Sequence, residues 1–339
     1  MEITTKRVFS GIKPTGRLTI GNYLGALRRF VRSQRNEPGT VERADSHLFC
    51  VVDLHALTVR HDPARLRDLV LQTGVLYLAA GLDPDRSVLF RQSDVPAHTE
   101  LAYLLECTGF VGELKRMIQY REKGGQPRTR VSLFTYPVLM AADILIYDST
   151  EVPVGDDQQQ HLELTRTLAK RFNRRYGETF TVPEMVPARV AARVADLTQP
   201  TRKMSKESPD DAPGVIRMLD SPDSVGRKVS RAVTDSMRGR PCYDPEVSPG
   251  VSNLLDILGA CTDQVPAELA DRYVSYRALK ADVTDAVNAT LAPIRSRYAE
   301  LASDPATVRR IFAEGAERAA ALAAPKLRRI RGAIGVGTP

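Results

Sequence analysis

Residues 8–23 read VFSGIKPTGRLTIGNY, and this stretch decides the fold of the first half of the chain. Residues 8–12 have the composition of a short buried strand, and a segment rich in glycine and proline follows them. From Ile20 onward, apolar residues recur at helical spacing as far as Gln34. Glycines let a backbone approach phosphate closely, and a helix N-terminus offers unpaired N–H groups. The stretch therefore predicts a phosphate-binding turn between a strand and a helix.

The rest of the first half repeats this alternation of strands and helices. We expect further strands at residues 47–54, 87–92 and 151–154. We expect helices at residues 63–80, 97–107, 112–122, 133–147 and 155–172. Alternation of this kind is typical of an α/β fold, a Rossmann-like doubly wound parallel sheet that binds ligands at the carboxyl ends of its strands.

The second half lacks a strand pattern and is punctuated by proline. We expect helices at residues 224–232, 250–258, 266–279, 284–301 and 306–329. The chain is thus predicted to have two domains. Residues 1–202 form the Rossmann-like catalytic domain, and residues 203–305 form a second, all-helical domain. The last helix, 306–330, is expected to pack back on the first domain.

Composition excludes several classes of protein. The chain has 339 residues, 42% of them hydrophobic and 26% charged, as in ordinary globular proteins with room for two domains. No apolar run is long enough to span a bilayer, and residues 1–7 lack the apolar core of a signal peptide. Four cysteines without C-x-x-C spacing indicate thiols in a reducing cytoplasm and not a zinc site. We expect a cytoplasmic protein without a membrane partner or a protein-bound metal.

The net charge of +7 suits a polyanion such as RNA, although a generally basic surface explains it equally well. Basic residues cluster at 227–231, 238–240 and 326–331, where they could contact phosphates. For each cluster taken singly, a solvated helix face is the simpler interpretation.

A second informative segment, Lys203-Met204-Ser205-Lys206, lies far downstream of the first. Two ammonium groups on a flexible loop can stabilise the charge that develops on leaving pyrophosphate. A solvated charged loop is the usual interpretation of any K-x-x-K pattern. Its position after the alternating half, with Met204 and Ser205 between the lysines, favours catalysis.

Together the two segments resemble the signatures of class I aminoacyl-tRNA synthetases, the TIGN form of HIGH and the KMSKS loop. The resemblance is to bacterial tryptophanyl-tRNA synthetases, and it continues through VVDLHALT, GELKRM, TYPVLMAADI, VPVGDDQQQH and AVTDS, which begin at residues 51, 112, 135, 152 and 232. It implies that L-tryptophan is activated with ATP and Mg²⁺ and then transferred to tRNA(Trp), with Mg²⁺ held through the ATP phosphates. It also implies a homodimer and an anticodon-binding role for the helical domain.

The resemblance further implies an ATP site. Its residues are Gly11, Ile12, Lys13, Thr19, Gly21, Asn22, Lys123, Gly155, Asp157, Lys203, Met204, Ser205 and Lys206. Among these, catalytic roles are implied for Lys13, Thr19, Asn22, Lys203 and Lys206. Simple helix capping is an alternative for Thr19, Asn22 and Asp157, and a surface position is an equal alternative for Lys123.

The tryptophan pocket is implied in the same way. Its residues are Phe9, Gly11, His55, Tyr136, Met140, Asp143, Ile144, Val152, Val154 and Gln158. Asp143 would accept the indole N–H, and an unpaired carboxylate in so apolar a helix would be costly. Pairing of Asp143 with a nearby arginine or backbone group is the alternative. Tyr136 and Gln158 would hold the α-amino group, whereas core packing is the simpler interpretation of Phe9 and Met140.

Two residues depart from the family pattern. Glu207 stands where the family usually has Ser, and a carboxylate ~4 Å from a phosphate charge would cost about 1 kcal/mol in water and about 4 kcal/mol at an intermediate dielectric. We therefore expect Glu207 to point outward, with Ser208 supplying the hydroxyl. Lys13 stands where Gln is common. It motivates the hypothesis of a secondary, inhibitor-tolerant tryptophanyl enzyme, and the absence of Trp fits an enzyme made when Trp is scarce, although chance explains that absence too.

Two rival interpretations remain open. One is a tyrosyl-tRNA synthetase, which shares this architecture, and Asp143 and the TIGN signature speak against it. The other is a synthetase-like paralogue that binds RNA or tryptophan as a regulator. Retention of Lys203, Lys206 and Asp143 favours an active enzyme, whereas Lys13 and Glu207 leave room for the regulator.

Overall fold

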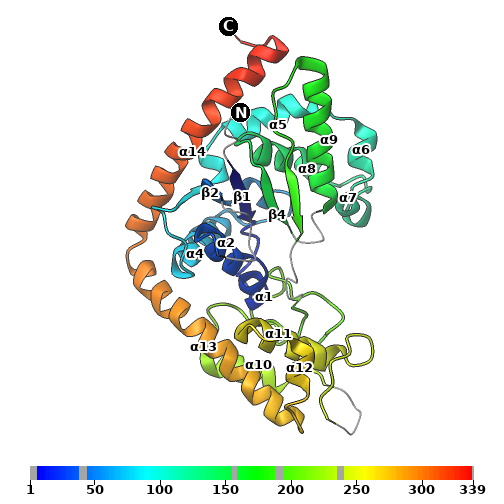
Figure 1. Cartoon of the computed structure of the whole chain (residues 1–339), viewed down its shortest axis with the longest axis vertical. Helices are drawn as coiled ribbons and strands as arrows, with labels where there is room; N and C mark the ends of the chain where they lie inside the picture. The colour runs from blue at the N-terminus through cyan, green and yellow to red at the C-terminus, as the bar shows by residue number, and fades with distance from the viewer. Residues whose placement is uncertain (1–5, 38–43, 155–158, 188–193, 235–239, 338–339) are drawn as a thin grey trace.

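The computed structural model describes residues 6–37, 44–154, 159–187, 194–234 and 240–337. Figure 1 shows an elongated molecule with a sheet-containing part at one end and a helical part at the other. The two longest helices, α13 (Tyr276–Ser303) and α14 (Pro305–Ile334), follow one another along one side and connect the two ends.

The sheet has five parallel strands in the order β3-β2-β1-β4-β5. Their bounds are β1 Arg7–Ile12, β2 Ser46–Val51, β3 Ser87–Arg91, β4 Glu151–Val154 and β5 Glu184–Pro187. The first four confirm the predicted strands, and the parallel order confirms the α/β fold. β5, which ends at Pro187, was not predicted. Proline is tolerated at a sheet edge, which is where β5 lies.

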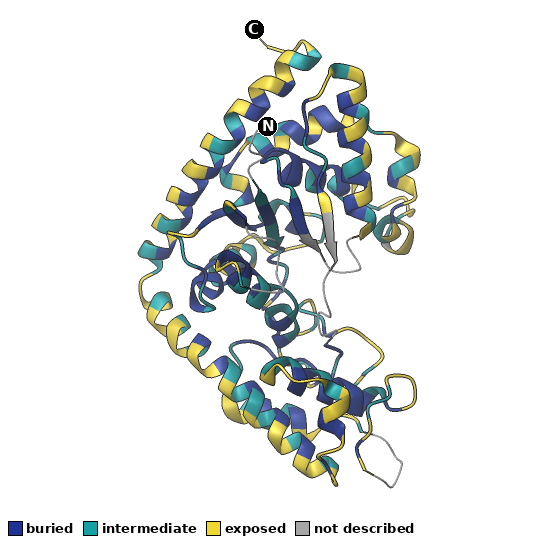
Figure 2. Cartoon of the chain, in the orientation of Figure 1, coloured by how far each residue is buried: buried dark blue, intermediate teal, exposed yellow. Residues whose placement is uncertain are grey.

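Side chains of the central strands alternate between two apolar clusters. Phe49 and Leu89 belong to the cluster that contains α2 (Arg28–Gln34) and α4 (Pro63–Ala79). Leu48 and Phe90 belong to the cluster on the opposite face. That second cluster contains α5 (Ala97–Glu106), α8 (Val131–Leu145) and α9 (Gln159–Tyr176). Helices therefore cover both faces of the sheet, as Figure 2 shows by the buried strands between them.

Two predicted helices prove to be interrupted. The helix predicted over residues 20–34 is a short α1 (Ile20–Asn22), a π-helical turn η1 (Tyr23–Leu27) and α2. The helix predicted over residues 112–122 is divided into α6 (Val111–Lys115) and α7 (Ile118–Lys123). The structure also has a one-turn helix, α3 (Asp53–Ala56), directly after β2.

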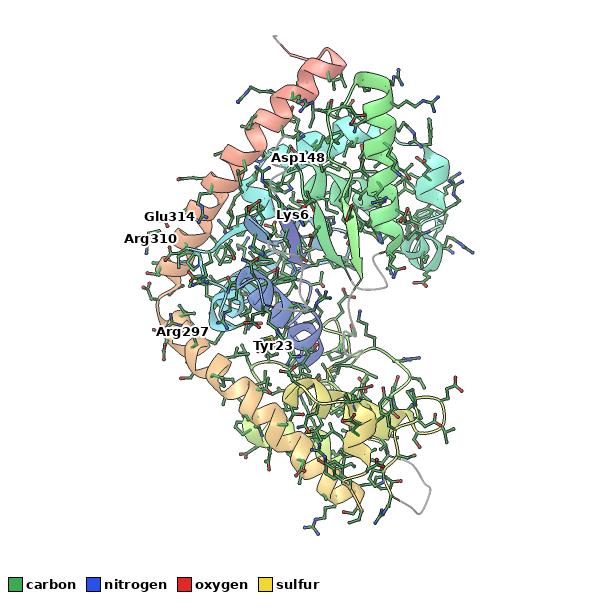
Figure 3. The ribbon with its side chains drawn as sticks, in the orientation of Figure 1. Lys6, Tyr23, Asp148, Arg297, Arg310 and Glu314 are labelled. Atoms are coloured by element: carbon green, nitrogen blue, oxygen red, sulfur yellow. The ribbon has the colours of Figure 1, made fainter. Side chains whose placement is uncertain are left out.

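Helix α14 packs against β3 and brings the end of the chain to the sheet. At Gly315 a Cβ atom would lie 1.8 Å from the carbonyl oxygen of Leu89, so only glycine permits this approach. Further along, the Lys326 ammonium lies 2.5 Å from Asp148 Oδ1 and donates to the Thr179 carbonyl at 2.6 Å (Asp148 is labelled in Figure 3). The helix is thus held by backbone contact at one point and by a buried cation at another.

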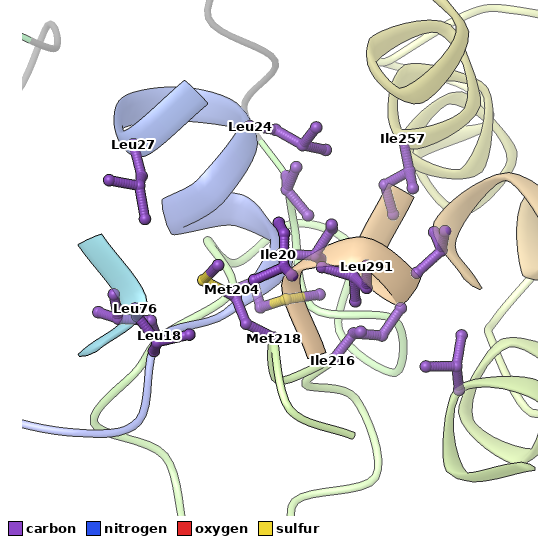
Figure 4. Close-up of a cluster of buried hydrophobic side chains, with 14 of the residues drawn as sticks. Leu18, Ile20, Leu24, Leu27, Leu76, Met204, Ile216, Met218, Ile257 and Leu291 are labelled. Carbon is purple, nitrogen blue, oxygen red and sulfur yellow. The ribbon is translucent and has the colours of Figure 1, made fainter. Parts of the chain in front are cut away.

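The helical part consists of α10 (Pro222–Ser230), α11 (Pro249–Thr262), α12 (Pro266–Ala270) and α13. The segment predicted as one helix over residues 266–279 contains the whole of α12 and the start of α13, separated by Asp271–Ser275. Figure 4 shows that Leu18 and Ile20 of the first half share an apolar cluster with Ile216, Met218 and Leu291. The core is therefore continuous between the two halves, and the domain limits stay a prediction.

Within the described ranges, no helix combines the length and the apolar character that crossing a membrane requires.

Candidate active site

The glycine-rich turn begins where β1 ends, beside its neighbour β2. A Cβ atom at Gly11 would lie 2.6 Å from the Cys50 carbonyl oxygen, so the two strands approach closely at this point. The Ile12 N–H donates to the Tyr77 hydroxyl at 2.9 Å, and that hydroxyl donates to the Cys50 carbonyl at 2.9 Å. The end of β1 is thereby fixed from α4 before the chain turns.

Thr19 and Asn22 form a reciprocal cap at the start of α1. Asn22 N–H donates to Thr19 Oγ1 at 3.2 Å, and Thr19 N–H donates to Asn22 Oδ1 at 3.0 Å. The capping interpretation of both residues is confirmed, and their contacts with ATP stay a prediction. Gly21 lies in the same turn, where a Cβ atom would be 3.2 Å from Val194 Cβ.

The lysine loop, residues 203–206, lies directly against this turn. A Cβ atom at Gly16 would be 1.9 Å from the Lys206 carbonyl oxygen, so the two backbones are in contact. Lys206 Nζ donates to the Lys13 carbonyl at 2.5 Å. Burial and, next, the neighbouring ammonium of Lys13 lower the pKa of Lys206 to about 8, against the opposing effect of Glu207. The structure thus brings the two predicted segments together.

The lysine loop is anchored at Met204, in its centre. Met204 is buried in the apolar cluster, and its N–H donates to the Val194 carbonyl at 3.0 Å. Lys203 forms an isolated antiparallel bridge with Ala195. Ser205 Oγ accepts from the Glu207 N–H at 3.1 Å.

Arg217 is a residue that the sequence analysis missed. It is buried, and its guanidinium donates to carbonyl oxygens of both segments. Nη1 donates to Arg17 at 2.8 Å and to Lys206 at 3.1 Å, whereas Nη2 donates to Ser208 at 2.7 Å and to Pro209 at 3.1 Å. An isolated arginine in an apolar sequence, VIRML, was the available signal. A buried charge must be compensated, and here four carbonyl dipoles compensate it.

Glu207 corrects one prediction. It does not point outward, because its Oε1 lies 3.6 Å from Lys13 Nζ and accepts from Thr15 Oγ1 at 3.0 Å. The cation at Lys13 draws the carboxylate toward the turn, so the two departures from the family pattern face each other. The Ser208 carbonyl accepts from Arg217, and the expected role of the Ser208 hydroxyl stays a prediction.

Asp143 on α8 lies at the centre of a buried polar network. His55 Nε2 is 2.9 Å from its Oδ2, His98 Nδ1 is 2.6 Å from its Oδ1, and Gln92 Nε2 donates to both oxygens at 2.8 Å. Burial alone would raise the pKa of Asp143, but the hydrogen bonds from His55 and His98 outweigh it and lower the pKa to about 2. The carboxylate is therefore ionised and accepts from all three neighbours.

The partners of Asp143 extend the predicted pocket. His55 was predicted, whereas His98 and Gln92 were not, and the alternative of an arginine or backbone partner is wrong. His98 Nε2 lies 2.8 Å from the Tyr147 hydroxyl, which continues the network toward the sheet. Position at the end of β3 was the only sequence signal for Gln92.

Other predicted pocket residues surround this network. The Tyr136 hydroxyl lies 2.5 Å from His161 Nε2, and the Tyr136 ring meets the His55 ring edge-on at 6.0 Å. Phe9 stacks on Tyr147, with the ring centroids 5.8 Å apart. Ile144 and Val152 are buried in the same apolar cluster, and Met140 packs against it. The core-packing interpretation of Phe9 and Met140 is confirmed, and their contact with a substrate stays a prediction.

Several predicted residues lie beyond what the structure describes. Gly155, Asp157 and Gln158 are outside the described residues. Lys123 and Val154 are described only as the last residues of α7 and β4. Their predicted roles in binding ATP and tryptophan remain predictions.

The chain matches known proteins over nearly its whole length. Residues 3–292 match the model of the family described as tRNA synthetases class I (W and Y). The chain is 55% identical over 338 residues to tryptophan–tRNA ligase 1 of Streptomyces coelicolor, covering 98% of both chains. Tryptophanyl-tRNA synthetase of Mycoplasma pneumoniae superposes with a TM-score of 0.87 at 32% identity, covering 98% of this chain and 99% of that one.

A structure from Campylobacter jejuni, of tryptophanyl-tRNA synthetase complexed with ADP and tryptophan, is also similar. Its TM-score is 0.80 at 33% identity, and the match covers 97% of this chain and 100% of that one. A Rossmann-like sheet, a capped TIGN turn and a lysine loop against it define an aminoacyl-tRNA synthetase of class I. The chain belongs to the family of class I tRNA synthetases for tryptophan and tyrosine.

Replacing Gly16 with alanine tests the contact between turn and loop. The added methyl would collide with the Lys206 backbone, so we expect Gly16→Ala to slow amino-acid-dependent exchange of pyrophosphate into ATP by about 10- to 100-fold. Gly25→Ala is the matched control, because a Cβ atom there meets nothing within 4 Å. Equal exchange rates for both variants would contradict a functional contact.

The half-buried ammonium of Lys206 predicts a pH dependence. Because its pKa is lowered to about 8, the free enzyme loses this positive charge as pH rises through that value. We expect kcat/KM for ATP to fall above about pH 8, since this parameter reports groups of the free enzyme. Lys206→Arg should move the fall to higher pH, and a profile that stays flat to pH 9.5 would contradict the assignment.

Proposed function

We propose that the chain is a tryptophan–tRNA ligase. It joins L-tryptophan to ATP, giving tryptophanyl-adenylate and pyrophosphate, and then transfers the tryptophanyl group to tRNA(Trp). Full-length similarity to tryptophan–tRNA ligases supports this proposal, as does the geometry of Asp143. The inhibitor-tolerant form suggested by Lys13 stays a prediction.

The observation that carries the proposal is the ionised, buried carboxylate of Asp143. A carboxylate offers about four acceptor sites, and His55, His98 and Gln92 make four contacts with them, so an indole N–H would be accepted in place of one of the two contacts of Gln92. Indole has a single N–H, whereas the phenol of tyrosine also accepts. A site built around a buried acceptor can reject a side chain without the matching donor, such as that of phenylalanine, by roughly 10⁴–10⁵-fold.

The turn and the loop supply the other half of the reaction. The substrate carboxylate attacks the α-phosphate, and the bond to the β-phosphate oxygen breaks as pyrophosphate leaves. The ammonium groups of Lys206, Lys203 and Lys13 stabilise the charge that develops on that leaving group. The 2′- or 3′-hydroxyl of tRNA then displaces AMP from the carbonyl carbon. No covalent bond to the protein is needed.

Mg²⁺ enters with ATP in this proposal. Among the described residues no group of three histidine, cysteine or acidic side chains is arranged to hold a metal ion. Hard cations bind phosphate oxygens and water well, so a triphosphate carries its own Mg²⁺ and the ion offsets part of its charge. The lysine loop supplies the protein's share of positive charge.

A homodimer is also part of the proposal. Large apolar side chains are exposed around the N-terminal half of α8, among them Tyr103 at 66%, Val131 at 75% and Leu57 at 38%. A groove of about 210 Å³ lies between α5 and α8 and is lined by Leu54, Tyr103, Tyr136 and Leu139, among others. Because Tyr136 also contacts the network of the tryptophan pocket, a second copy seated there would adjoin the active site.

Exchange of labelled pyrophosphate into ATP, with Trp, Tyr and Phe in turn, tests the reaction. We expect exchange with Trp alone. In Asp143→Asn, kcat/KM for Trp should fall by about 10- to 100-fold, because an amide cannot accept from all the donors it faces. Asp256→Asn is the control, since that carboxylate accepts from Tyr243 in the helical part, away from the pocket.

Other outcomes would select the rivals. Exchange with Tyr would identify a tyrosine enzyme. A folded protein that binds RNA and exchanges with none of the three would be the regulatory paralogue.

Size-exclusion chromatography with light-scattering detection tests the dimer. We expect a mass of twice 37.4 kDa for the unchanged chain and half of that for Tyr103→Glu, because a carboxylate cannot be buried unpaired in the interface. Val274→Glu, at an exposed valine of the helical part, should stay dimeric. A monomeric unchanged chain would remove this part of the proposal.

A further inference from the structure

Glu207 and Lys13 connect the lysine loop to the glycine-rich turn through their side chains. One oxygen, Glu207 Oε1, receives both contacts, from Lys13 Nζ at 3.6 Å and from Thr15 Oγ1 at 3.0 Å. Both partners belong to the turn that the proposed function assigns to the ATP phosphates. The carboxylate therefore binds the same cation, Lys13, that an ATP phosphate would bind.

The backbone around Glu207 is held on both sides, which keeps this residue close to the glycine-rich turn. The carbonyl before it, on Lys206, is held by Arg217 Nη1, and the carbonyl after it, on Ser208, is held by Arg217 Nη2. The Glu207 N–H is bound to Ser205 Oγ at 3.1 Å. The Lys206 backbone also rests on Gly16. The contact with Lys13 thus follows from the way the loop is anchored.

The electrostatics of the site make this contact consequential. Lys13, Lys203 and Lys206 lie together, and the pKa of Lys206 is lowered by burial and by both other cations while Glu207 raises it. Glu207 therefore supplies a compensating negative charge to this cluster. A triphosphate brings more negative charge to the same place and competes with the carboxylate for the Lys13 ammonium. The side chains of Lys13 and Glu207 are 31% and 45% exposed, so both have room to separate.

We propose that Glu207 is a positioning residue that acts through Lys13. It holds the Lys13 ammonium while ATP is absent and gives it up to the phosphates when ATP binds. The inference rests on the proposed function, because it assigns Lys13 to the triphosphate. Its consequence is a specific one: the pair weakens the binding of ATP and leaves the chemical step unchanged. A uniform cost of binding of this kind alters KM and not kcat.

A double-mutant cycle tests the pair. Steady-state KM and kcat for ATP are measured in tryptophan-dependent pyrophosphate exchange for the unchanged chain, Glu207→Gln, Lys13→Gln and the double variant. We expect Glu207→Gln to lower KM for ATP by about fivefold, the equivalent of about 1 kcal/mol for a partly exposed pair. In the Lys13→Gln background the same change should lower KM by less than about twofold, with kcat constant within about twofold in each comparison that removes Glu207.

Glu314→Gln is the matched control. Glu314 forms a similar exposed ion pair with Arg310 at 3.0 Å on α14, on the outer side of the molecule (Figure 3), and its loss should leave KM for ATP unchanged. Raising the salt concentration should shrink the difference between the two backgrounds, since exposed charges are screened.

Three results would overturn the inference. An equal fall in KM in both backgrounds would mean that Glu207 repels phosphate directly and not through Lys13. A rise in KM in Glu207→Gln would mean that the carboxylate assists ATP. A fall in kcat with KM unchanged would place Glu207 in the chemical step.

Failure of the proposed function gives a different pattern. If the unchanged chain supports no exchange with tryptophan, that function is wrong, and the cycle is measured as dissociation constants for ATP by calorimetry. A larger effect of Glu207→Gln on the dissociation constant in the Lys13 background than in the Lys13→Gln background supports the pair. Equal effects in the two backgrounds refute it.

Discussion

The structure depends on one short stretch of backbone pairing, where residues after the lysine loop return to the N-terminal turn. Ile20 N–H donates to the Ile216 carbonyl at 3.0 Å, and Met218 N–H donates to the Leu18 carbonyl at 2.9 Å. Between these two bonds stands Arg217, whose guanidinium collects carbonyls from both segments. Segments about 200 residues apart in sequence are thereby held in register, and the lysine loop and the glycine-rich turn meet there.

The charges of Asp143 and Lys206 are stabilised in different ways. Asp143 receives three donors and stays ionised, because hydrogen bonds replace the water that burial removed. Lys206 has one short bond to the Lys13 carbonyl and lies among other cations, so its charge is held weakly. The first arrangement suits the constant recognition of a neutral N–H group. The second suits a group that gains its full charge when an anionic ligand arrives.

Sequence patterns predicted the elements and the two signature segments, because strand alternation, helix spacing and glycine turns are local properties. They could not predict which side chains, distant in sequence, contact each other. His98 and Gln92 reach Asp143 from 45 and 51 residues away, and nothing local in their surroundings indicates it. Glu207 was placed outward from repulsion alone, and the attraction of Lys13, 194 positions earlier, reversed that direction.

The shared apolar cluster also limits how the chain can be divided. Leu18, Ile20 and Leu24 are buried in one cluster with Ile216 and Met218, from the segment before α10, and with Leu291 of α13 (Figure 4). A fragment ending near residue 202 would expose Leu18, Ile20 and Leu24 to water as one apolar surface. It would also lack α14, which packs against β3. The two halves therefore share one apolar core, and a cut at that point would expose part of it to water.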